Sequence, residues 1–216
     1  MTGVQDRLEV TDALREELLT LGTATVYEAS GLDCYLPATL RPAWVGAQVV
    51  GTALPVRTAP GDNLPLHLAL EQAAPGEVLV VDAGAAPHGY WGEVLTVAAQ
   101  QRGVLGLVID GGVRDTAQLE QLSFPVFSTW TALQGTVKDD PGTVGDPIAL
   151  GAAPVARGDL VVADSDGVVV VPAARVAEVL VAARQRAAAE AGYLDRLRAG
   201  ESTMQVYGFS RGSAAR

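Results

Sequence analysis

Apolar and polar positions follow two different periods along the chain. Valine-rich apolar runs predict buried strands, and stretches with apolar positions three and four residues apart predict helices. The predicted helices cover residues 11–20, 23–30, 66–74, 91–102, 115–122 and 172–198, and the predicted strands cover residues 47–58, 78–81, 104–109, 126–127, 143–144, 147–150, 160–163 and 168–171. Strands and helices alternate through the first part of this pattern, which indicates parallel strands joined by right-handed helical crossovers.

After Pro125 the pattern changes to short strands separated by turns, such as residues 140–142 and 164–167. We therefore expect a second, more antiparallel layer before the last helix. No repeat, low-complexity segment or change of composition marks a linker. The fold class that we expect is α/β, as an α/β/β sandwich with helices at both ends. It would form a single domain over residues 1–216, with its core at about 20–172 and a C-terminal helix at about 172–198.

Composition excludes several classes of protein. The 216 residues carry 25 acidic and 15 basic side chains, a net charge of −10, and this surplus repels the phosphates of nucleic acids. The longest apolar runs are too short to span a bilayer, and the first seven residues lack the pattern of a secretory signal. A lone cysteine, Cys34, cannot form an internal disulfide and suits a packing role. We expect a cytoplasmic protein with no nucleic-acid or membrane partner.

Candidate chemistry gathers where two of the predicted parallel strands end, because ligands of open α/β sheets collect at that edge. Glu93 lies in the first turn of one following helix, and Arg114 and Asp115 open the next. The first helix also offers free amides, among them those of Val94 and Leu95. Carboxylates with water suit Mg²⁺, and a guanidinium with amides suits a carboxylate or a developing oxyanion. The alternative is that the acidic residues are ordinary helix caps and Arg114 is a surface cation.

The residues around this edge resemble a known family. WGEVL at residues 91–95 and VIDGGVRD at residues 108–115 are similar to the RraA-like proteins, which include class II 4-hydroxy-4-methyl-2-oxoglutarate (HMG)/4-carboxy-4-hydroxy-2-oxoadipate (CHA) aldolases. The signature of that family is an acidic residue, twenty residues, then Arg-Asp, and 114 − 93 − 1 = 20 here. The resemblance extends to residues 61–64, 75–82, 135–142, 158–164, 166–172 and 198–201.

The resemblance implies a fold of the RraA-like, swivelling-domain-like type and a divalent-metal pyruvate aldolase. Such an enzyme uses Mg²⁺ or Mn²⁺ to cleave a 4-hydroxy-4-carboxy-2-oxo acid to pyruvate and a second oxo acid, often with oxaloacetate decarboxylase activity through the same enolate. By position, Asp115 would bind the metal directly, Glu93 would hold it through water, and Arg114 would bind the substrate and stabilise the enolate oxygen. The substrate-binding set implied by the resemblance is Arg114, Gly92, Val94 and Leu95. Characterised relatives typically have aspartate in place of Glu93.

Family members assemble as homotrimers or hexamers with the active site at a subunit interface. In them, an acidic residue from the neighbour's C-terminal helix is proposed to help a water act as base. At about 100° per residue, Glu190 of the predicted last helix lies inside an apolar stripe that contains Ala183 and Leu194. Glu190 is therefore a catalytic candidate, with a stripe edge or a wet interface as the alternative.

A different function class remains open, because some RraA-like proteins bind and regulate an RNA-degrading enzyme instead of catalysing a reaction. The alternative to the lyase is thus a non-catalytic trimeric regulator of the RNase E inhibitor type. Three further polar residues carry simpler expectations. His67 is expected in the core or at its boundary, Lys138 on a surface turn, and His88 in a solvated loop beside the candidate site.

Overall fold

The computed structural model describes residues 10–151 and 153–210, so the start of the chain, which bears on a secretory signal, lies outside them. The helices are α1 (Asp12–Ser30), α2 (Leu64–Gln72), α3 (Glu93–Gln101), α4 (Thr116–Gln121), the 3₁₀ turn η1 (Ala173–Arg175), α5 (Val176–Arg198) and α6 (Thr203–Val206). The strands are β1 (Arg41–Pro42), β2 (Val49–Arg57), β3 (Glu77–Trp91), β4 (Gly106–Val113), β5 (Val126–Thr131), β6 (Thr143–Val144), β7 (Ile148–Leu150), β8 (Ala153–Val155), β9 (Leu160–Ala163) and β10 (Val168–Val171).

One mixed sheet organises these elements, in the order β1-β5-β4-β3-β2-β9-β10, with β6 also paired to β2. The strands β2, β3, β4 and β5 are parallel, whereas β1, β9 and β10 are antiparallel to their neighbours. The predicted α/β class is confirmed. The second layer differs from the prediction, because β6, β9 and β10 continue the main sheet, and only β7 and β8 form a separate pair.

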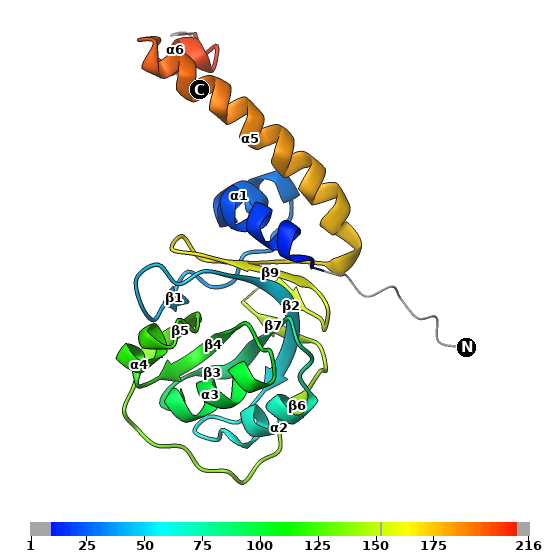
Figure 1. Ribbon diagram of the computed structural model, residues 1–216, viewed down its shortest axis with the longest axis vertical. Helices are drawn as coiled ribbons and strands as arrows, with labels where there is room; N and C mark the ends of the chain where they lie inside the picture. The colour runs from blue at the N-terminus through cyan, green and yellow to red at the C-terminus, as the bar shows by residue number, and fades with distance from the viewer. Residues whose placement is uncertain (1–9, 152, 211–216) are drawn as a thin grey trace, which may run out of the picture.

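The side chains of the sheet pack into three apolar clusters, because successive residues of a strand point to opposite faces. Leu79 and Val81 of β3 pack in the cluster under α2, α3 and α4, whereas Val78 and Val80 pack in the cluster that includes β7 and β8. A third cluster joins β9 and β10 to α1 and α5. The sheet therefore has α2, α3 and α4 over its parallel strands and α1 and α5 at its β9–β10 end (Figure 1).

The largest departure from the predicted elements is in β3 and β4. Residues 83–90 were expected to form a loop and the Gly111-Gly112 pair a turn, but both lie within strands. Asp82 pairs with Asp110 and Trp91 with Val113, so nine residue steps of β3 oppose three of β4. The excess chain bulges out of β3, and the alternating apolar pattern that identifies a strand is lost there.

The helical ends agree with the prediction in outline. Gly22 has φ 75° and ψ 162° inside α1, which divides it into the two predicted helices. The long helix α5 extends away from the sheet, and the unpredicted α6 folds back on its far end (Figure 1). No helix in the described ranges is long and apolar enough to cross a membrane.

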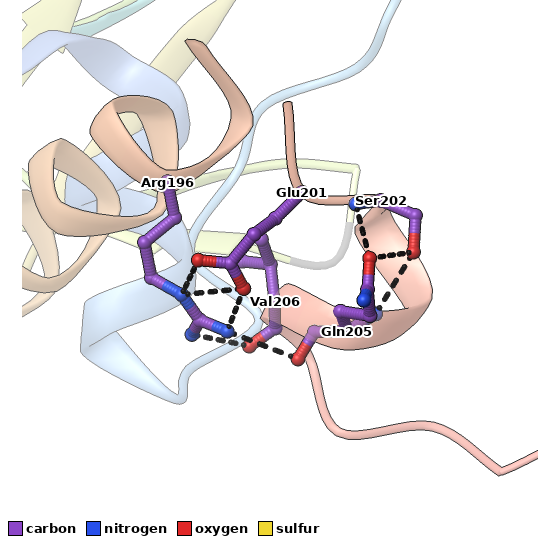
Figure 2. Close-up of polar contacts among 5 residues, drawn as sticks. All are labelled: Arg196, Glu201, Ser202, Gln205 and Val206. Carbon is purple, nitrogen blue, oxygen red and sulfur yellow. Dashed lines mark hydrogen bonds and ion pairs between the residues drawn. The ribbon is translucent and has the colours of Figure 1, made fainter. Parts of the chain in front are cut away.

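One arginine holds α6 against α5. The Arg196 guanidinium pairs with the Glu201 carboxylate at 2.6 Å and donates to the carbonyl oxygens of Gln205 and Val206 (Figure 2). Ser202 and Gln205 form a reciprocal capping box at the start of α6. With only four residues, α6 is too short to show the apolar periodicity by which a helix is usually recognised, which is why the sequence did not predict it.

Candidate functional site

The starts of α3 and α4 lie side by side because the strands before them end in register. Trp91, the last residue of β3, pairs with Val113, the last residue of β4. The contact continues one residue beyond β4, since the Arg114 amide donates to the Trp91 carbonyl at 2.9 Å. The predicted edge of the sheet therefore does bring the Glu93 region next to Arg114 and Asp115.

The Asp115 carboxylate reaches across to the neighbouring helix. Asp115 has a left-handed backbone, with φ 57°, and its side chain makes no capping bond to α4. Instead its Oδ2 accepts a hydrogen bond from the Glu93 amide at 3.1 Å and lies 4.0 Å from the Arg114 Nε. Asp115 is thus not the ordinary cap of its own helix.

Gly92 makes this close approach possible. A Cβ at Gly92 would overlap the Asp115 Oδ2 and come within 3.3 Å of the Arg114 Cγ. Any larger residue would therefore displace the carboxylate from the first turn of α3. A glycine is required at this position by space and not by backbone angles, because its φ is −167°.

A cavity of about 200 Å³ opens over these two helix starts. Its lining is Asn63, His67, Gly89, Tyr90, Trp91, Gly92, Val94, Leu95, Arg114, Asp115 and Lys138. Five of the candidate residues thus surround one space. Glu93 is exposed beside it and is tied to the site through its backbone bond to Asp115.

Three polar side chains of the lining were not predicted as site residues. His67 is partly buried and Lys138 lies exposed in a loop, as expected, and both also line the cavity, as does Asn63. The Asn63 Nδ2 donates to the Tyr90 carbonyl at 3.0 Å, whereas its buried Oδ1 has no hydrogen-bond partner among the described residues. The sequence signal for Asn63 was its place in residues 61–64, which share the family resemblance but carried no predicted role.

The cavity has both signs of charge. Arg114 and Lys138 carry positive charge, and Asp115 carries negative charge near the amides of the α3 start. Burial lowers the pKa of His67, and the nearby Lys138 ammonium lowers it further, so His67 stays neutral to lower pH than a free histidine. A small anion with one polar substituent matches this distribution of charge.

A divalent metal fits this set of donors only if it keeps most of its water. Within residues 10–151 and 153–210, no three acidic, histidine or cysteine side chains gather closely enough to enclose an ion. Asp115 supplies a carboxylate at the cavity, and exposed Glu93 supplies a second beside it. Mg²⁺ commonly binds in this way, through one or two carboxylates, several waters and an anionic substrate.

Glu190 does not reach this site within one chain. Its side chain is 41% exposed on α5 and forms an ion pair with Arg186 at 2.9 Å, and Arg186 also pairs with Glu28 of α1. The helix α5 lies at the other end of the sheet from α3 and α4 (Figure 1). His88 is also outside the lining, with its Nδ1 3.0 Å from the Gly135 carbonyl oxygen.

Comparisons with known proteins find a family model and relatives that match most of the chain. The family model described as RraA-like: Aldolase/RraA matches residues 11–170. A provisionally named 4-hydroxy-4-methyl-2-oxoglutarate aldolase from Halalkalibacterium halodurans is 35% identical over 170 residues, which cover 78% of this chain and 81% of the relative. A solved structure of an uncharacterized protein from Pseudomonas syringae pv. tomato has a TM-score of 0.78 and 27% identity, covering 93% of this chain and 99% of its own. An unusual member of the RNase ES inhibitor RraA protein family from Streptomyces coelicolor has a TM-score of 0.73 and 30% identity, covering 87% and 98%.

Proposed function

The chain belongs to the RraA-like family, and on that premise we propose that it is a divalent-metal-dependent lyase. Its substrates are 4-hydroxy-4-carboxy-2-oxo acids of the HMG/CHA type, which it cleaves to pyruvate and a second oxo acid. The observation that carries the proposal is the convergence of Arg114, Asp115 and the amides of the α3 start on one cavity. The name of the relative from Halalkalibacterium halodurans supports the choice of substrate class.

The pyruvate half of the substrate binds at the α3 start. The first amides of a helix have no partner within the helix and attract anions, so Val94 and Leu95 bind the carboxylate next to the oxo group. Gly92 leaves room for this approach, and Arg114 donates to the 2-oxo oxygen. Both contacts fix the orientation of the bond that breaks.

Asp115 would hold the metal directly, and Glu93 would hold it through water. When bound, Mg²⁺ or Mn²⁺ would supply a concentrated positive charge that stabilises developing negative charge. Arg114 adds a second positive charge from the protein itself, at a point where negative charge develops during the reaction.

In the cleavage step the 4-hydroxyl group loses its proton and the C3–C4 bond breaks. The electron pair of that bond moves toward the 2-oxo oxygen, where Arg114 stabilises the resulting enolate, and protonation at C3 gives pyruvate. Oxaloacetate gives the same enolate when its C3–C4 bond breaks to release carbon dioxide. Decarboxylation of oxaloacetate is therefore a second activity of this site.

The other half of the substrate faces the polar side chains that complete the lining. Lys138 binds the second carboxylate. This contact favours dicarboxylate oxo acids over pyruvate alone.

The assembly is a homotrimer, or a hexamer built from trimers, with the sites at subunit interfaces. Because α5 extends away from its own sheet (Figure 1), Glu190 acts at the site of a second copy, where it positions the water that accepts the proton. Its ion pair with Arg186 orients the carboxylate for this role.

The experiment that tests the proposal is pyruvate release from HMG and from oxaloacetate, with Mg²⁺ or Mn²⁺ and again with EDTA. We expect release from both substrates with metal and none with EDTA. A folded protein that binds metal but turns over neither substrate would contradict the lyase.

The similarity to the Streptomyces coelicolor protein supports one other candidate, a non-catalytic trimeric regulator of the RNase E inhibitor type. Co-purification with a ribonuclease of that class, without turnover of either oxo acid, would favour this alternative. Metal-dependent release of pyruvate separates the two functions.

A further inference from the structure

Asp62 is a buried carboxylate in the turn between β2 and α2, and it holds three backbone amides. It is 3% exposed. Its Oδ2 accepts from the amides of Asp139 at 2.7 Å and Asp140 at 2.8 Å, and its Oδ1 accepts from the amide of Leu64 at 2.8 Å. Burial raises the pKa of this carboxyl, but the three amides and the Lys138 ammonium lower it more, so Asp62 is ionised.

The segment that Asp62 holds has little else to fix it. Residues 137–140 are all exposed, so side-chain packing does not place them. Two backbone hydrogen bonds join Val137 to the turn, one to the Gly61 carbonyl at 2.9 Å and one from the Asn63 amide at 3.0 Å. The remaining anchors to this turn are the two amides bound by Asp62. Charge-assisted bonds of this kind are about twice as strong as neutral ones.

Lys138 lies between these anchored residues and lines the cavity. The turn that contains Asp62 also carries Asn63, which lines the cavity. The hydroxyl of Tyr90, another lining residue, accepts a hydrogen bond from the Gly61 amide at 2.6 Å. The bond between Gly61 and Tyr90 therefore joins the turn to the cavity lining. The Asp62 carboxylate in turn joins this turn to the loop that carries Lys138.

We infer that Asp62 is a positioning residue that holds Lys138 over the cavity and so sets the affinity for ligands with a second carboxylate. The ligand part of this inference rests on the proposed function, whereas the anchoring of the loop does not. Asp62→Asn is the sharpest test, because it removes the charge that strengthens these bonds and leaves one acceptor oxygen, which cannot accept from the Leu64 amide and from the Asp139 and Asp140 amides at once.

The matched control is Asp139→Asn, which removes one negative charge from the same loop but leaves the Asp62 carboxylate and its bonds in place. Two quantities are measured for both variants: the hydrogen exchange rates of the amides at 139 and 140, and the affinities for 2-oxoglutarate and pyruvate with Mn²⁺ present. For Asp62→Asn we expect exchange at least about tenfold faster and 2-oxoglutarate bound about tenfold more weakly, with pyruvate affinity within about twofold. For Asp139→Asn we expect neither change.

Unchanged exchange at both amides, or an equal loss of affinity for the two ligands, would overturn the inference. If Asp62→Asn does not fold, Lys138→Met provides the second variant, and it must lose 2-oxoglutarate affinity selectively. A wild-type protein that binds neither ligand would contradict the proposed function, and the ligand part would fall with it. The exchange rates would then still decide whether Asp62 anchors the loop.

Discussion

Gly92 leaves the space that the Asp115 carboxylate occupies beside the backbone of α3. The carboxylate lies against the first turn of α3 only because no side chain stands at position 92. The left-handed backbone of Asp115 turns its side chain toward that position. Asn and Asp tolerate this conformation better than most residues, so the geometry costs little at Asp115.

Gly92→Ala should therefore abolish most activity without unfolding the protein. Its φ of −167° suits alanine, but the added methyl group would push away the Asp115 carboxylate. We expect pyruvate release to fall at least about tenfold, which corresponds to a loss of about 1.4 kcal/mol in transition-state stabilisation. The control is Gly135→Ala, whose added Cβ meets nothing within 4 Å. Equal activity of the two variants, measured at matched thermal stability, would refute the role of Gly92.

The elements show which parts of the fold the sequence can predict. The valine-rich strands β9 and β10 and the strand-helix alternation through α4 were predicted because burial on both faces leaves continuous apolar runs. The bulged half of β3 was not, since residues 83–90 contain glycine, alanine and proline where a strand usually shows alternation. The short strand β8 was not predicted either, because it has only three residues and one of them, Pro154, cannot donate a ladder hydrogen bond.

The candidate site was predictable where it depends on strand ends and not where it depends on distant loops. Glu93, Arg114 and Asp115 follow neighbouring strands, so their proximity follows from the topology. Lys138 comes from a loop after β5, and it reaches the cavity through the backbone bonds of Val137 to the turn before α2 and through the bonds of residues 139 and 140 to the buried carboxylate of Asp62. A contact of this kind between residues 77 positions apart leaves no periodic signal in one sequence.

At the scale of the whole molecule, the long helix α5 is the feature that one chain leaves unexplained. It continues beyond the sheet and ends in the α6 segment that Arg196 holds in place (Figures 1 and 2). An arm of this length suits a contact with a second copy. Glu190 would then complete the site of a neighbouring copy and not that of its own chain.

Complementation between two inactive variants tests this arrangement. Arg114→Ala keeps Glu190, and Glu190→Gln keeps Arg114, so each mixed trimer contains one site with both residues intact. If subunits exchange at random, three quarters of the trimers are mixed and about a quarter of wild-type pyruvate release returns. No recovery after subunit exchange, with exchange verified by two different affinity tags, would place Glu190 outside the site.

The most direct test of the account is metal-dependent pyruvate release from HMG by Asp115→Asn, compared with Glu120→Gln. Both variants remove one negative charge from the α4 region, and asparagine keeps the left-handed backbone at position 115. We expect Asp115→Asn to lose about a hundredfold or more in rate, because several kcal/mol of charge stabilisation would depend on the ion that we propose it holds. Glu120→Gln, on the exposed side of α4, should stay within about twofold of wild type. Wild-type release by Asp115→Asn, still abolished by EDTA, would contradict the assignment of the metal to this carboxylate.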